Sequence, residues 1–242
     1  MKMLSFAGRN AKEMLRDPLT VIFSLGFPLV LLLLLSAIQA NIPVELFEIG
    51  RLTPGITVFG LAFMSLFSAT LIARDRESAL LVRLYTTPLT AVDFILGYAL
   101  PIVPLSVGQC VVCYVAALAL GLELTVNILY AILFILPVSL LFIAIGLLCG
   151  SVLNVKQVGG ICGALLTNLT AWLSGVWFDL ELVGGAFEKI ANVLPFVHAV
   201  RLECTVLSGS FEGVLLNLLW VLGYAVIAMT AAVALFVRQM KK

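Results

Sequence analysis

The sequence predicts an all-α integral membrane protein with six transmembrane helices. Hydrophobic residues make up 62% of its 242 residues and charged residues only 11%, about half the charged fraction of a soluble domain. The mean hydropathy is +1.18. Six apolar stretches lack Asp, Glu, Lys and Arg, and each is long enough to cross a hydrocarbon core about 30 Å thick. We therefore expect a single membrane domain over 1–242, with no soluble domain and no nucleic-acid partner.

The first segment, 1–17, is expected to be an amphipathic helix lying flat in the membrane interface. Its apolar side holds Leu4, Ala7, Ala11, Met14 and Leu15. Its charged side holds Lys2, Arg9, Lys12, Glu13 and Arg16. A soluble helix packed on a partner protein is the alternative.

The predicted spans cover about 19–40, 52–73, 94–121, 124–150, 158–178 and 213–237. The first of them is too long for the apolar region of a cleavable signal, which has about 7–15 residues. Pro101 and Pro104 predict a kink in the third span. Residues 179–212 carry too many charges to span and too many apolar residues for a solvated loop. A pair of partly inserted helices, or a re-entrant hairpin shielded by protein, is expected there.

The distribution of Lys and Arg predicts the orientation. The two termini, the 74–93 loop and the 151–157 turn hold 11 of the 14 basic residues, whereas the opposite loops carry 8 of the 13 acidic residues. Cytoplasmic loops are enriched in Lys and Arg. Both termini and the 74–93 loop are therefore expected in the cytoplasm.

The loop between the second and third spans is the most charged part of the chain. It contains Arg74, Asp75, Arg76, Glu77, Arg83 and Asp93. Each charge would cost about 2.5–3.5 kcal/mol at the centre of a bilayer, so this segment must lie at a membrane surface. Its middle has good helix formers, and neither Gly nor Pro interrupts it before Pro88. A short helix with one apolar and one basic edge is expected, a shape suited to contact with a partner.

Several kinds of chemistry have no motif in this chain. It lacks a G-x-x-x-x-G-K-[ST] phosphate loop, and it has one histidine, His198, which we interpret as structural. Cys110 and Cys113 form a C-x-x-C motif inside a span, where helix packing is favoured over redox or metal chemistry. No span carries an acidic residue of the kind used by proton- or sodium-driven carriers. We expect neither enzymatic activity nor a bound cofactor, and the energy for any transport must come from a partner.

Small and hydroxyl side chains form stripes on two of the spans. The stripe on the second span is Thr57, Gly60, Met64 and Ser68. The stripe on the fifth span is Gly163, Thr167, Thr170 and Ser174, with Asn168 beside it and a G-x-x-x-G formed by Gly159 and Gly163. Close helix packing, with hydroxyls bonded to their own backbone, is one interpretation. The other is that both faces line a dimer interface through which substrate moves, and the two are compatible.

Taken together, these motifs resemble those of the membrane subunits of type II ABC exporters, the ABC-2 permease family. The resemblance is strongest in A-R-D-R-E-S at 73–78, T-P-L-T at 87–90 and Gly97, with a second match in P-F-V-H-A-V-R at 195–201. Ala79 and Leu80 depart from the Gly-Thr of the family pattern, Val82 replaces an acidic residue, and Tyr98 replaces Lys.

The resemblance implies a coupling helix between spans 2 and 3 that docks into a separate P-loop ATPase. Two ATPase copies would bind ATP and Mg, and a second permease copy, identical or a paralogue, would complete a pathway in the plasma membrane, the inner membrane of a bacterium. The implied contact residues are Asp75, Arg76, Glu77, Leu81, Arg83, Leu84 and Pro88, the last ending the helix.

The substrate implied by the short external region is a lipophilic drug-like molecule or a small peptide. Export of polysaccharide or lipid-linked glycan is the runner-up. A secondary carrier or channel, and a membrane protein without transport activity, are the remaining alternatives.

Overall fold

The computed structural model describes residues 2–42, 47–78, 80 and 90–240, and this part of the chain is helical without strands. The expectation of an all-α membrane protein is therefore confirmed. The elements are α1 (Lys2–Arg16), α2 (Pro18–Val21), η1 (Ile22–Gly26), α3 (Phe27–Asn41), α4 (Ile49–Glu77), α6 (Ala91–Ala99), α7 (Ile102–Ala119), α8 (Asn127–Val152), α9 (Val155–Val158), η3 (Gly159–Leu166), α10 (Thr167–Leu173), α11 (Leu180–Val183), α12 (Gly185–Val193), α13 (Pro195–Ser208) and α14 (Val214–Met240).

Five helices in the described ranges are long and apolar enough to cross a membrane. They are Pro18–Asn41, Ile49–Glu77, Ala91–Ala119, Asn127–Val152 and Val214–Arg238. A sixth candidate is the pair α12 and α13, which is bent by 75° and is either a broken span or a re-entrant loop. The structure therefore supports five to six spans.

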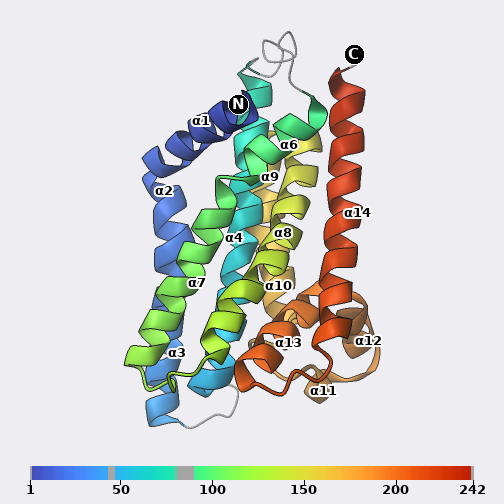
Figure 1. Cartoon of the computed structure of the whole chain (residues 1–242). Coiled ribbons are helices and arrows are strands. Elements are labelled where there is room, and N and C mark those ends of the chain that lie inside the picture. Colours follow the sequence, from blue (N-terminus) through green and yellow to red (C-terminus); the bar gives the residue numbers. More distant parts are fainter. Residues whose placement is uncertain (1, 43–46, 79, 81–89, 241–242) are drawn as a thin grey trace.

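The fifth predicted span, 158–178, differs from the prediction in its limits and regularity. The helical run α9–η3–α10 covers residues 155–173 and contains a π-helical stretch, Gly159–Leu166. It is not one of the five apolar helices, because Lys156, Gln157 and Asn168 lower its hydropathy. Figure 1 nevertheless shows this run within the bundle, and it contacts α4.

Both termini lie at the same end of the bundle, and α11, α12 and α13 lie at the other end (Figure 1). At that far end His198 joins three helices. Its Nδ1 is 2.8 Å from Asn217 Oδ1 on α14, its Nε2 is 2.9 Å from the Asn192 carbonyl of α12, and its ring stacks on Trp220. These contacts hold the bent α12–α13 pair against α14.

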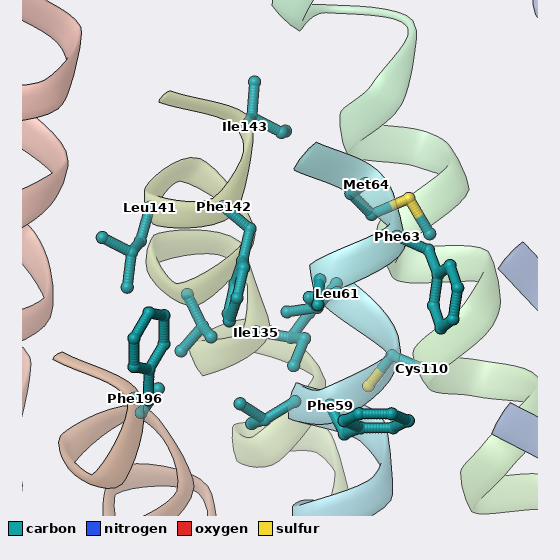
Figure 2. Packing of buried hydrophobic residues seen from close by; sticks show 14 of the residues in the cluster. Phe59, Leu61, Phe63, Met64, Cys110, Ile135, Leu141, Phe142, Ile143 and Phe196 are labelled. Atoms are coloured by element: carbon teal, nitrogen blue, oxygen red, sulfur yellow. The ribbon is translucent and has the colours of Figure 1, made fainter. Parts of the chain in front are cut away.

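Helix α4 occupies the centre of the bundle and is buried along most of its length. Figure 2 shows its Phe59, Leu61 and Met64 among residues of α7, α8 and α13. Helices α4 and α8 approach each other closely where Gly146 lies against Ser65 and Ser68, and Gly150 against Ala69. Gly146 and Gly150 thus form a G-x-x-x-G motif that brings two helix backbones together, as is common in membrane bundles.

Gly146→Ala is expected to lower the free energy of unfolding by about 1–3 kcal/mol, the usual cost of overpacking. A Cβ at this position would collide with the Ser68 side chain and would lie 2.7 Å from the Cα of Ser65, so one helix must move. Thermal unfolding of the purified chain in detergent measures the change.

Gly108→Ala on α7 is the matched control, because nothing lies within 4 Å of a Cβ built there. This variant should lose no stability, since Ala is the better helix former by about 0.5–1 kcal/mol. Equal melting temperatures for the two variants would contradict the close approach of α4 and α8.

Candidate functional site

The last turn of α4 carries four consecutive charges, Arg74, Asp75, Arg76 and Glu77, which we call the four-charge turn. Each of these side chains contacts another element of the bundle. Arg74 lies 3.4 Å from Asp17 at the start of α2. The other three side chains bind α1, α6, α8 and α9, as described below. One helical turn therefore joins most of the elements at this end of the molecule.

Asp75 is the buried centre of the four-charge turn. Its carboxylate accepts two hydrogen bonds from the Arg9 guanidinium, at 2.7 and 2.9 Å, and one from the Tyr98 hydroxyl at 2.8 Å. The Asp75 side chain is only 3% exposed, against 39% for Arg9. A buried carboxylate needs such partners, because an isolated buried charge is costly. The hydrogen bonds to Asp75 raise the pKa of the Arg9 guanidinium, which favours its charged form.

The same contact fixes α1 on the bundle. Asn10 is fully buried, and its Nδ2 donates a hydrogen bond to the Gly97 carbonyl of α6 at 3.0 Å. The Phe6 ring lies against Gly97 and packs edge-on to Tyr98, with 5.0 Å between ring centroids. A side chain at position 97 would displace Phe6. Helix α1 is therefore docked through one face, and its Leu4 and Leu15, predicted on the apolar side, are exposed.

Arg76 and Glu77 bind the turn between α8 and α9. Arg76 Nη1 donates to the carbonyls of Gly150 and Leu153, at 2.9 and 3.2 Å. These carbonyls lie at the C-terminal end of α8, where backbone acceptors lack partners within the helix. Glu77 Oε1 accepts from the backbone N–H of Val155, the first residue of α9, at 2.9 Å. Each side chain thus has the charge that the adjoining helix end favours.

Through these contacts, the four-charge turn can act as a mechanical junction. A displacement at the end of α4 would be applied at once to α1, α6 and the α8–α9 turn.

The structure assigns the predicted contact residues to different environments. Arg74–Glu77 continue α4 rather than beginning a separate helix, and Ser78 is its C-cap. Asp75 is occupied by Arg9 and Tyr98, while Arg76 and Glu77 hold the α8–α9 turn. The other predicted contact residues, Leu81, Arg83, Leu84 and Pro88, lie outside the described residues.

The predicted stripe on the second span lies inside the protomer. Thr57, Gly60, Met64 and Ser68 are all buried. Thr57 and Ser68 donate their hydroxyls to carbonyls of α4 itself, and Gly60 lies against Pro28 and Gln109. These contacts agree with the interpretation of the stripe as a surface for close helix packing within the protomer. In this arrangement the four residues present no surface to a second copy.

The stripe on the fifth span is divided. Thr167, Thr170 and Ser174 are buried, Gly163 packs against Leu66, and Asn168 is exposed. The hydroxyls of Thr167 and Thr170 and the amide of Asn168 donate to carbonyls of their own helical run. A different face of η3 and α10 is exposed, and it carries Gly159, Gly160, Ala164 and Leu165 as well as Asn168.

The sequence interpretation missed Arg9 and Tyr98 as partners of the charged loop and Asn10 as a partner of α6. It also missed the G-x-x-x-G of Gly146 and Gly150. Only the glycine spacing is visible in the sequence. It also placed Glu203 in an outer connection, whereas the structure buries this residue completely on α13. Neither oxygen of its carboxylate has a hydrogen-bond partner among the described residues. Glu203 lies outside the six predicted spans, and its complete burial between helices was not expected.

No group of three or more His, Cys, Asp or Glu side chains in the described ranges could hold a metal ion. Cys110 and Cys113 are buried free thiols.

The chain matches a protein-family model. The model of the ABC-2 type transporter covers residues 2–206, which include α1, the four-charge turn and most of α13. A search of curated proteins gave no match. Because the family model covers far more than half of the chain, the chain belongs to the ABC-2 type transporter family and is a type II ABC permease.

Proposed function

We propose that this chain is the permease subunit of an ATP-driven exporter, and that the four-charge turn passes movement from a separate ATPase to the spans. The observation that carries the proposal is the set of contacts made by Asp75, Arg76 and Glu77, which tie α4 to three neighbouring segments. The segment that follows, up to Pro88, is the proposed docking helix. Two ATPase copies would bind ATP and Mg, and this chain would bind neither.

In the proposed orientation, both termini and the four-charge turn lie on the cytoplasmic side of the plasma membrane, which in a bacterium is the inner membrane. It is supported by the bias of Lys and Arg toward these segments and by the presence of both termini at one end of the bundle. A second permease copy, identical or a paralogue, would complete the pathway. The exposed face of η3 and α10, with Gly159, Gly160 and Asn168, allows close packing of such a copy.

In this proposal the exported molecule is a lipophilic drug-like compound or a small peptide. A polysaccharide or a lipid-linked glycan is the second candidate.

The first test is whether an ATPase accompanies the chain. When the tagged full chain is purified from native membranes in mild detergent, a P-loop ATPase should co-purify in about equal amounts, and mass spectrometry identifies it. An unrelated tagged membrane protein from the same source controls for nonspecific binding. Recovery of the chain alone, with transport driven by an ion gradient, would establish a secondary carrier instead.

A further inference from the structure

A partly open cavity lies at the end of the bundle opposite the termini. It has a volume of about 460 Å³ and lies between the start of α4, the segment that follows α10, and α13. We call it the far-end cavity. Gly175, whose φ of +77° favours glycine, turns the chain along its wall after α10. Its volume falls within the range of small-molecule sites, about 300–1,000 Å³.

The floor of the far-end cavity is apolar. Val176, Val197 and Val200 line it, and each is almost completely buried by the rest of the chain. Ser174 also lines it, is 2% exposed, and has a hydroxyl without a hydrogen-bond partner among the described residues. Buried hydroxyl groups without a hydrogen-bond partner are uncommon in protein cores. The Ser174 hydroxyl therefore provides one polar group for a bound molecule on an otherwise apolar floor.

The rim of the far-end cavity carries balanced charges. Arg51 and Arg201 supply two positive charges, and Asp179 and Glu181 supply two negative charges. Arg51 forms an ion pair with Asp179 that bridges α4 and the segment after α10. Arg201 donates one hydrogen bond to Asn192 at 2.7 Å, which leaves further guanidinium donors for a ligand.

An apolar floor beneath a charge-balanced rim defines the chemistry of the occupant. We propose that the far-end cavity binds the exported molecule, and that this molecule is a zwitterionic amphiphile. Its apolar body lies on the three valines, and the anionic part of its head group lies at Arg201. The proposal rests on the proposed function, which places this end outside the cell, where the molecule would leave.

The lining of the far-end cavity also bears on the alternative substrate. None of the described residues that line it is aromatic. Sugar rings are commonly held against aromatic faces, and a long glycan would need an extended path rather than a cavity of about 460 Å³. The Arg51–Asp179 pair is exposed, and exposed ion pairs are weak. It can therefore open to release a small amphiphile without a large rearrangement.

The binding test uses fluorescence of the purified full chain in lipid nanodiscs. Trp177 follows the lining residue Val176 and packs edge-on to Phe59 on α4, with ring centroids 5.8 Å apart. The probe is a lysophosphatidylcholine with a dibrominated acyl chain, which quenches nearby tryptophans. The signal from Trp177 is the part that Trp177→Phe removes. Saturable quenching of Trp177 is expected.

Two changes at the far-end cavity should weaken this binding. Val200→Phe fills the floor and should raise the apparent dissociation constant at least tenfold. Arg201→Gln should raise it severalfold, whereas Arg201→Lys should stay close to the unmodified chain. The matched control is Val226→Phe on α14, because Val226 is 60% exposed and distant from the cavity lining. It should bind normally. Equal saturable quenching in all four variants, or quenching that never saturates, would overturn the site.

A second measurement separates an exported molecule from a resident membrane lipid. The chain reconstituted with its co-purified ATPase should extrude fluorescent lysophosphatidylcholine on addition of ATP, and Val200→Phe should reduce the rate at least tenfold. Loss of binding with unchanged extrusion would mean that the cavity holds a resident lipid, which overturns the proposal. Absence of any ATPase would refute the proposed function, while the quenching experiment still decides whether the site exists.

Discussion

Asp75→Ala is expected to lower the free energy of unfolding by about 3 kcal/mol and to abolish substrate-stimulated ATP hydrolysis by the complex. Breaking a buried ion pair costs about 3–5 kcal/mol. The lower end of this range applies to Asp75→Ala, because 39% of the Arg9 side-chain surface remains exposed to solvent. The variant removes the acceptor of both Arg9 and Tyr98, so α1 loses its main polar attachment to α4. Denaturant or thermal unfolding gives the stability, and phosphate release gives the activity.

Arg74→Ala, at the neighbouring position, is the matched control for this stability change. The Arg74–Asp17 pair is exposed and 3.4 Å long, so its loss should cost less than about 1 kcal/mol. The loss of unfolding free energy in Asp75→Asn should lie between the losses in Asp75→Ala and Arg74→Ala, because an amide oxygen can still accept a hydrogen bond from Tyr98. A double-mutant cycle of Asp75→Ala with Arg9→Ala should give a coupling energy of at least about 1.5 kcal/mol, as for hydrogen bonds to charged groups. Equal losses for Asp75→Ala and Arg74→Ala would show that Asp75 is no more important than a surface charge.

The double variant Arg76→Glu with Arg83→Glu is expected to abolish substrate-stimulated ATP hydrolysis while the chain still enters the membrane. Arg76 binds the C-terminal carbonyls of α8, and a carboxylate there would be repelled by them and by the helix dipole. Arg83 is the proposed ATPase contact on the docking helix. Activity is measured with the complex in liposomes, and insertion from the yield of monodisperse protein.

The single variants separate the two roles. Arg76→Glu alone should lower the melting temperature, because it disturbs the α8–α9 turn. Arg83→Glu alone should leave the melting temperature unchanged and weaken ATPase binding. Lys156→Glu, an exposed charge reversal on α9 at the same end, controls for a general effect of charge. Substrate-stimulated activity that survives in the double variant would rule out coupling through this segment.

Much of this fold follows from composition. The five strongest apolar runs each became a long helix, because uncharged stretches of this length must satisfy their backbone groups internally in lipid. The run at 155–173 was harder to define. Its glycines, Lys156, Gln157 and Asn168 weaken the apolar signal, and its π-helical stretch has no sequence signature. The bent α12–α13 pair could be expected as partly inserted, but the burial of Glu203 could not, because it depends on how α13 lies against α4 and α8.

The site was predictable only in its location. Charge density marks 74–77 as a segment that must lie at the membrane surface. Its partners are invisible to periodicity, since Arg9 and Asp75 are 66 positions apart and meet only when α1 folds back on the bundle. Tyr98 stands where the family pattern has Lys, and in the structure its hydroxyl donates a hydrogen bond to Asp75.

The hydroxyl groups of α4 have a consequence for the synthesis of the protein. All five Ser and Thr residues of this helix donate to carbonyls of α4 itself: Thr53, Thr57, Ser65, Ser68 and Thr70. A helix emerging from the ribosome enters the bilayer before α7, α8 and α13 have been made. Because its hydroxyls are already satisfied within the helix, α4 can reside in lipid as an apolar segment. It can later exchange lipid for protein neighbours without rearranging any of these hydrogen bonds. The helix that is most buried in the finished bundle can therefore be stable in the bilayer before the helices that surround it are inserted.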